Sequence, residues 1–133
     1  MPHFIVEYSQ NLENEIDFDE FFTLVHDNLG ASGVFPLGGI RSRAIGMKHY
    51  RIADGKHDYA FVHMLLKVGS GRDLETRKRV CDDLFTVIEG YFAPLQARRL
   101  LAITFEMQEI HPTLTYRKNN IHAFLQKQKQ DAD

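Results

Sequence analysis

Cysteine is almost absent from this chain, since Cys81 is the only one in 133 residues. One cysteine excludes an internal disulfide framework. No apolar run is long enough to cross a bilayer, and the N-terminus lacks the basic region and small-residue cleavage site of a secretory signal. We therefore expect a cytoplasmic protein without membrane contact. Cys81 lies among Val80, Leu84 and Phe85, which favours a buried structural thiol over a nucleophile.

The chain also lacks a large excess of charge of either sign. Its formal net charge is −2, so it has no global basic field that would recruit nucleic acid. Hydrophobic residues make up 44% of the chain and charged residues 26%, which is ordinary for a globular protein. The length is enough for one domain with a real core.

Familiar catalytic and metal-binding motifs are missing as well. The chain has seven histidines, but no two have the spacing of a helical ligand pair such as His-x-x-x-His, so we expect no metal site. It contains no serine-hydrolase elbow and no Cys-x-x-Cys motif, and no spacing of its carboxylates indicates an acid–base pair. Structural roles are expected for most of the histidines.

Hydrophobic periodicity is the main structural signal that is present. Four segments are typical of strands because they are β-branched and aromatic or alternate in polarity: 4–6, 40–52, 59–68 and 101–107. Two segments repeat apolar residues with a period near 3.6 and are predicted to be helices: 17–29 and 73–95. Gly30 is expected to end the first helix. The expected apolar face of the second helix contains Cys81, Leu84, Phe85, Ile88 and Phe92.

The order of these elements is β-α-β, a turn at 54–56, and β-α-β again. We therefore predict an α+β fold with a duplicated β-α-β unit, in halves of about 1–57 and 58–112. Each crossover should give a parallel strand pair, so the four strands form one sheet with both helices on one face. The other face is expected to be apolar and to pack on further subunits in a closed oligomer. Residues 119–125 are expected to form a short helical turn, and 126–133 a frayed polar tail outside a domain of 1–125.

Pro2 directly follows the initiator methionine and begins the first strand-like run. If Met1 is removed, the Pro2 nitrogen becomes a secondary amine with a free lone pair, whereas an internal proline has no basic nitrogen. Small residues at the second position, proline included, generally permit this removal. Pro2 is therefore a candidate base, and the alternative is that it is an ordinary residue next to the start of the chain.

Two arginine features are candidates for anion binding. Arg41 and Arg43 lie two apart on a predicted strand, so they share a face and could bind carboxylates, unless they only line a solvated sheet edge. Arg72 follows Gly69-Ser70-Gly71 at a helix start, where backbone N–H groups can meet an anion, although a plain turn has the same composition. The loop lacks the Lys-Ser/Thr of a phosphate loop, which excludes nucleotide binding of that kind.

Several segments together resemble one known family. The matching segments are Pro2-His3-Phe4-Ile5-Val6-Glu7, Phe35-Pro36-Leu37, Gly39-Ile40-Arg41-Ser42-Arg43, Ala53-Asp54-Gly55, His57-Asp58-Tyr59-Ala60-Phe61-Val62-His63-Met64, Gly71-Arg72, Phe105-Glu106, His111-Pro112-Thr113-Leu114 and Asn119-Asn120. To about Leu125 the chain resembles the 5-carboxymethyl-2-hydroxymuconate Δ-isomerases of the tautomerase superfamily. The resemblance implies the same duplicated β-α-β fold, assembled as a homotrimer with active sites near the subunit contacts.

The resemblance also implies a function. Members of that family act without metal or organic cofactor on a carboxylated dienol, in the breakdown of homoprotocatechuate formed from 4-hydroxyphenylacetate. The amino-terminal proline is their base, which corresponds to Pro2, and their carboxylate-binding arginines correspond to Arg41 and Arg72, with Arg43 in the same motif. Two alternatives stay open: a non-catalytic trimeric module that binds an organic anion, and a tautomerase or decarboxylase-like relative with another substrate.

Overall fold

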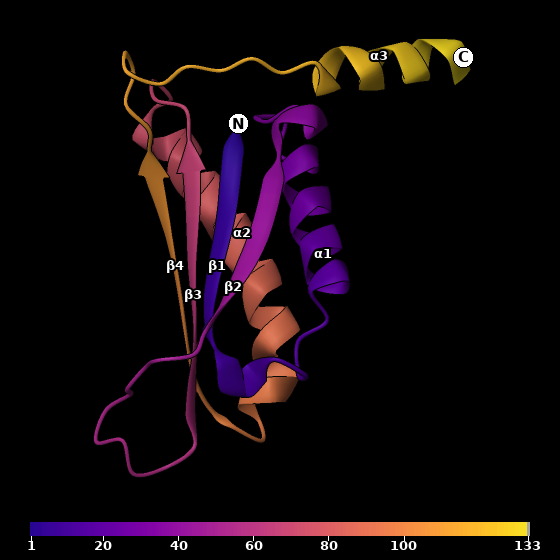
Figure 1. Ribbon diagram of the computed structural model, residues 1–133. Coiled ribbons are helices and arrows are strands. Elements are labelled where there is room, and N and C mark those ends of the chain that lie inside the picture. Colours follow the sequence, from indigo (N-terminus) through magenta and orange to yellow (C-terminus); the bar gives the residue numbers. More distant parts are fainter. Residues whose placement is uncertain (133) are drawn as a thin grey trace.

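The computed structural model describes residues 1–132, and Figure 1 shows their arrangement. The regular elements are β1 (Pro2–Ser9), η1 (Gln10–Leu12), α1 (Phe18–Ala31), η2 (Leu37–Gly39), β2 (Arg41–Met47), β3 (Tyr59–Val68), α2 (Leu74–Gln96), β4 (Leu100–Glu109) and α3 (Ile121–Ala132). The elements η1 and η2 are single 3₁₀ turns. In this part of the chain, no helix combines the length and the apolar character that a membrane span needs.

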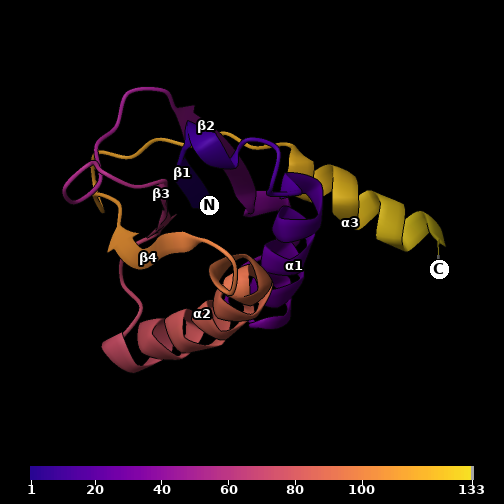
Figure 2. The ribbon, with the colours of Figure 1, turned by 90° about the horizontal axis from the view of Figure 1, so that it is seen from below.

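The four strands form one mixed sheet in the order β2-β1-β3-β4. β1 is parallel to β2 and β3 is parallel to β4, while β1 and β3 are antiparallel neighbours at the centre. Both α1 and α2 cover the same face of the sheet, as the view along the strands shows (Figure 2). The predicted α+β fold with two β-α-β units is therefore confirmed.

The core lies between this sheet face and the two helices. Alternate side chains of the central strands point into it, so Phe4, Val6, Met64 and Leu66 are completely buried. Phe21 of α1 packs on Phe4, with ring centroids 5.9 Å apart. Each large apolar side chain that is buried in this way contributes roughly 1.5–3 kcal/mol, and these side chains fix the central strands in register.

The helices begin as their sequences indicate, but the first one ends later than predicted. Asp17 caps α1 by accepting a hydrogen bond from the backbone N–H of Glu20 (3.1 Å), and Asp73 caps α2 by accepting one from Thr76 (2.7 Å). The prediction that Gly30 ends the first helix is wrong, because α1 continues through it to Ala31. Gly30 is tolerated there on an exposed side of the helix.

The buried face of α2 differs by one position from the prediction. Val80, not Cys81, lies in the core with Leu84 and Ile88, and Cys81 is only half-buried. Val80, Leu84, Ile88 and Phe92 are spaced four residues apart, so their side chains form one row against the sheet. Cys81 and Phe85 lie at the margin of this row. The Cys81 thiol, expected to be buried, is therefore only partly buried, and this burial raises its pKa.

The second strand is shorter than the predicted range of 40–52. β2 ends at Met47 because its partner β1 ends at Ser9, the residue that pairs with Met47. β2 is an edge strand, so beyond this point no neighbour accepts or donates ladder hydrogen bonds. The chain then runs through an extended loop, in which the Asp54 carboxylate accepts hydrogen bonds from the Lys56 N–H (3.0 Å) and the Tyr59 hydroxyl (2.9 Å).

The C-terminal segment is more regular than predicted. Instead of a short turn at 119–125 and a frayed tail, one helix, α3, runs from Ile121 to Ala132, and residue 133 lies outside the described residues. The Gln and Lys residues that suggested a tail are also good helix formers. The segment after β4 crosses the end of the sheet where the N-terminus lies, and α3 extends from there away from the body (Figure 1).

The open face of the sheet is less apolar than expected. Apolar Ile5, Phe61 and Leu65 alternate along it with charged or polar neighbours. Glu7 and His63 lie across from each other at 3.6 Å, with both side chains nearly half exposed. The face therefore combines apolar patches with groups that can form polar contacts, a mixture found in protein–protein interfaces.

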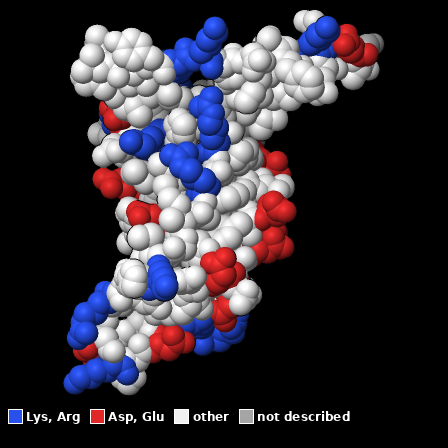
Figure 3. Space-filling view, in the orientation of Figure 1, with Lys and Arg blue, Asp and Glu red and all other residues white. Residues whose placement is uncertain are grey.

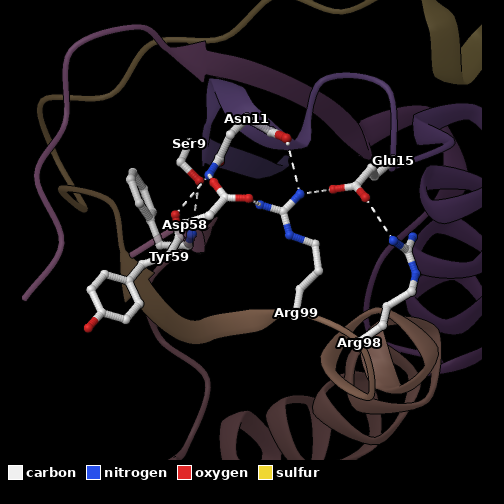
Figure 4. A network of polar contacts seen from close by, with 8 residues as sticks. Ser9, Asn11, Glu15, Asp58, Tyr59, Arg98 and Arg99 are labelled. Atoms are coloured by element: carbon white, nitrogen blue, oxygen red, sulfur yellow. Dashed lines mark hydrogen bonds and ion pairs between the residues drawn. The ribbon is translucent and has the colours of Figure 1, made fainter. Parts of the chain in front are cut away.

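Arg99 joins three segments at the end of the sheet opposite the N-terminus (Figure 4). Its guanidinium forms ion pairs with Glu15 and with Asp58 (3.0 Å to the latter) and donates to the backbone carbonyl of Asn11 (3.2 Å). Only 11% of the Arg99 side chain is exposed, and 24% of the Glu15 side chain, whereas the Asp58 side chain is largely exposed. Arg98 adds a second ion pair to Glu15 at 2.8 Å, and 59% of its side chain is exposed.

Arg99→Ala is expected to reduce the free energy of unfolding by about 1–3 kcal/mol, because it removes the donor to the Asn11 carbonyl and the ion pair to the partly buried Glu15. Arg98→Ala is the matched control and should cost less than about 1 kcal/mol, since its pair is exposed.

The same contacts make this stabilisation depend on pH. The hydrogen bond from Arg98, followed by the contacts with Arg99, lowers the pKa of the Glu15 carboxyl from 4.5. This stabilisation is present above pH 4.5 and is lost as the pH falls through the lowered pKa, so the difference between parent and Arg99→Ala should narrow there. Urea unfolding at pH 7 and pH 3 measures both effects, and equal stability of parent and variant at pH 7 would contradict them.

Candidate active site

The N-terminus lies where three strand ends meet. Pro2, which is buried, pairs in register with Val68 at the end of β3, and His3 pairs with Arg41 at the start of β2. The turn η2 comes directly before β2, and the loop before α2 follows β3. The fold therefore brings Pro2, Arg41 and the segment that carries Arg72 to the same end of the sheet.

Gly39 forms the surface against which the terminal amine lies. A Cβ atom at this position would stand only 2.5 Å from the Met1 nitrogen, closer than real Cβ contacts come. Only glycine therefore allows the backbone to approach so closely. Met1 itself is half-buried, so the first residue of the chain occupies an enclosed place and does not project into solvent.

The charged groups that shift the pKa of this amine are three arginines. Burial lowers the pKa of the Met1 amine from 8.0, and the nearby Arg41, Arg117 and Arg72 guanidiniums lower it further, in that order. Lys and Arg side chains gather over this end of the sheet (Figure 3). A basic nitrogen held here is thus biased toward its neutral form, while a carboxylate would find several cationic partners.

Arg72 is held in place by its own surroundings. Its guanidinium donates to the carbonyls of Gly69 (3.2 Å) and Val34 (3.4 Å) and lies 4.8 Å above the ring centroid of Phe35. These contacts fix the cation while leaving some of its five N–H donors for a ligand. The Gly71 N–H donates to the Glu109 carboxylate (3.1 Å), so this N–H of the glycine-rich loop is not available to an anion.

Arg43 takes a different position from the other two predicted arginines. It is exposed, and its Nη1 atom lies 3.1 Å from Nδ1 of His3 on the open face of the sheet. Burial, then Arg43 and Arg41, lower the pKa of the His3 imidazole. The structure therefore groups Arg41 and Arg72 around the terminal amine and places Arg43 beside them, one alternation further along β2.

Sequence reasoning missed the residues that the C-terminal segment brings to this place. Arg117 acts on the terminal amine, and Asn119 donates to the Gly38 carbonyl at 3.1 Å while its side-chain oxygen accepts from the Ile121 N–H at 2.6 Å. The ring of His122 lies on the glycine pair 38–39. Asn119 is a residue type that often caps a helix, so it could have indicated that a helix begins here. The polar composition of the segment after it favoured a frayed tail instead.

A groove of about 370 Å³ lies between η2 and α3, next to the glycine pair. Its lining is mostly apolar on the η2 side and polar on the α3 side: Pro36, Leu37, Gly38, His122, Leu125, Gln126 and Lys129. The groove shares Gly38 and His122 with the surroundings of the terminal amine. The site is therefore bounded by the sheet end, the arginines and the first turns of α3.

Comparison with known proteins gives consistent matches over most of the chain. The model of the 5-carboxymethyl-2-hydroxymuconate isomerase family matches residues 2–125. The 5-carboxymethyl-2-hydroxymuconate Delta-isomerase of Escherichia coli is 51% identical over 123 residues, which are 92% of this chain and 98% of that protein.

Solved structures agree with these sequence matches. A 5-carboxymethyl-2-hydroxymuconate isomerase from Deinococcus radiodurans R1 superposes with a TM-score of 0.87, at 39% identity and covering 93% of each chain. A protein described as a fused 4-OT wild type symmetric trimer has a TM-score of 0.62 at 14% identity, covering 91% of this chain and 98% of the other, and shares the fold. The chain therefore belongs to the 5-carboxymethyl-2-hydroxymuconate isomerase family and is an isomerase.

Proposed function

We propose that this protein converts 5-carboxymethyl-2-hydroxymuconate to 5-oxopent-3-ene-1,2,5-tricarboxylate in homoprotocatechuate degradation, with Pro2 as the general base. The observation that carries the proposal is the position of the terminal amine among Arg41, Arg72 and Arg117, in a chain of this family. The proposal uses neither a metal ion nor an organic cofactor.

The reaction moves one proton along a conjugated system. The neutral nitrogen of Pro2 takes the proton of the 2-hydroxyl group, and the electron pair shifts along the diene as the C2 carbonyl forms. The protonated Pro2 then returns a proton to the carbon at the far end of the diene. Base and acid are thus one group in two protonation states, and the enzyme is regenerated at the end of the cycle.

The pKa of the base decides whether this works at neutral pH. An ordinary α-amino group has a pKa of about 7.7–8.0, and a useful base at pH 7 needs a pKa near 7. Burial and the three arginines lower the pKa of the amine at this position. A Pro2 amine beside the same groups would be subject to the same forces, which favour its neutral form.

The arginines are proposed to hold the substrate as well. Arg41 and Arg72 bind its carboxylates and stabilise the negative charge that develops on the dienolate. Arg43, paired with His3, is proposed as a third and more distant carboxylate contact. The Met1 amine lies against Gly39 and near enough to Arg41, Arg72 and Arg117 for them to lower its pKa, so removal of Met1 would both free the Pro2 amine and open room for the substrate beside them.

We propose that residues 1–125 form the isomerase domain and that three chains assemble through the open sheet faces. Sizing with light scattering should then give three times the mass of one chain, independent of dilution into the micromolar range. A stable monomer with full activity would contradict this prediction, because the mixed apolar and polar sheet face would then have no partner.

An activity assay distinguishes the proposed function from two other functions. Ultraviolet absorbance follows the loss of the tricarboxylate dienol with purified protein, and acceleration that depends on Pro2 supports the proposal. A non-catalytic module for an organic anion would bind the dienol without converting it. A tautomerase of different preference would turn over a simpler dicarboxylate faster than the tricarboxylate.

A further inference from the structure

His122 lies at the junction of the proposed active site and the groove between η2 and α3. It is the second residue of α3 and is half-buried, although the rest of that helix extends away from the body. Asn119 ties the start of the helix to the Gly38 carbonyl, so the imidazole is held at a defined place. No part of the proton transfer described above uses this side chain.

The two edges of the imidazole face different neighbours. A Cβ atom on Gly38 would lie 2.9 Å from Nδ1 and 3.1 Å from Cα of His122, so the Nδ1 edge packs on Gly38. A Cβ atom on Gly39 would lie 3.4 Å from Cε1 and 3.6 Å from Nε2. That same point is 2.5 Å from the Met1 nitrogen, so the Cε1–Nε2 edge of the ring and the Met1 amine border the same glycine.

The chemistry of this edge is not used by the protein itself. Neither ring nitrogen of His122 has a hydrogen-bond partner within residues 1–132. An imidazole nitrogen can donate to a carboxylate oxygen, and the groups around this space, Arg41, Arg72 and Arg117, make it a place for anionic oxygens. The ring therefore presents an unused polar atom to the space in which a carboxylated substrate would lie.

We propose that His122 is a substrate-binding residue, whose Nε2–H donates a hydrogen bond to a carboxylate oxygen of the bound dienol. The inference rests on the proposed function, because it assumes that this substrate takes the space of Met1. In this arrangement α3 supplies one wall of the active site, opposite the sheet end. The C-terminal segment then contributes to substrate selection, and its docking on Gly38 is what positions the contact.

The position of the donor atom gives a sharp test with three variants. His122→Gln can place an amide N–H near the position of Nε2, His122→Asn reaches only as far as Nδ1, and His122→Phe keeps the ring shape without a donor. We expect His122→Phe to lower kcat/KM for the tricarboxylate dienol about 10- to 100-fold, mainly through KM. His122→Gln should recover most of this loss, and His122→Asn should recover little.

A purely structural role predicts another order. If the ring only packs on the glycine pair, His122→Phe should match the parent and the shorter His122→Asn should be the poorest, and this order would overturn the inference. Lys127→Ala, an exposed change on the same helix, is the matched control and should leave KM unchanged. Thermal melting identifies a variant that fails to fold, in which case the Gln and Asn variants still decide the order.

A binding measurement separates this inference from the proposed reaction. Calorimetric titration with propane-1,2,3-tricarboxylate, which cannot react, should show weaker binding to His122→Phe than to the parent and to His122→Gln. Such a result without turnover of the dienol by the parent would refute the proposed function and keep the carboxylate contact. Equal binding by all three proteins, or no binding by the parent, would overturn the contact.

Discussion

Pro2→Ala is expected to lower kcat by about 10²–10⁴-fold, the range that a positioned general base supplies. Alanine leaves a primary terminal amine on a more flexible backbone, since the ring that fixes φ is gone. The fold should remain, because Pro2 is the first residue of β1 and the buried side chains further along the strand hold it in the sheet. The loss of ultraviolet absorbance of the dienol measures kcat, and thermal melting is the control for folding. Unchanged turnover in the variant would refute the assignment of Pro2 as the base.

The pH profile of the parent should report the same amine. Burial and the neighbouring arginines lower the pKa of an amine at this place from 8.0, so the neutral, active form persists below pH 8. The value of kcat/KM should therefore fall on the acidic side, as the pH drops through the lowered pKa and the amine becomes protonated. An acidic limb centred above pH 8 would contradict the electrostatic argument.

Arg41→Ala is expected to reduce kcat/KM for the tricarboxylate about 100-fold, which corresponds to about 2.8 kcal/mol. The loss arises because a substrate carboxylate in a partly buried site is left without its bidentate donor. The effect on 2-hydroxypenta-2,4-dienoate, which has one carboxylate, should be smaller. The ratio of the two losses therefore tests the carboxylate contact separately from the effect of Arg41 on the amine.

The control for Arg41→Ala is Arg79→Ala, which removes an exposed guanidinium on α2 whose hydrogen bonds within residues 1–132 go to the Ser32 carbonyl at 3.4 Å. It has the same change of charge but should leave both substrates unaffected. Equal losses on both substrates in Arg41→Ala would argue that the residue acts only through the pKa of the amine. No loss on either would remove Arg41 from the site.

Hydrophobic periodicity was sufficient to predict the fold but not where each strand and helix ends. The two β-α-β units follow from local patterns, because the apolar stripes of α1 and α2 and the alternation in β3 are set by neighbouring residues. The end of β2 at Met47 depends on where β1 stops, which no pattern within β2 reveals. Only the first turn of α3 was predicted, because the segment after residue 125 is polar and lacks the apolar stripe typical of a packed helix.

Some residues of the candidate site could likewise be predicted from the sequence, and others could not. Pro2, Arg41 and Arg72 were available from motifs, and the structure brings all three to one end of the sheet. Arg117 and His122 reach that end only because the chain after β4 crosses the sheet, a contact between residues about 80 positions apart in sequence. Their roles depend on the two small residues Gly38 and Gly39, which leave room for the imidazole and the amine. Such a pairing is visible only in three dimensions.

The most direct test of the proposed mechanism is to compare two forms of this chain, one that begins at Pro2 and one that keeps Met1, after separating them and recording their intact masses. The mechanism predicts that activity on the tricarboxylate dienol belongs to the form that is lighter by one methionine, because only there is the Pro2 nitrogen a free amine. Equal activity of the form that retains Met1 would contradict it, since its Pro2 nitrogen is an amide and its site is filled by the methionine.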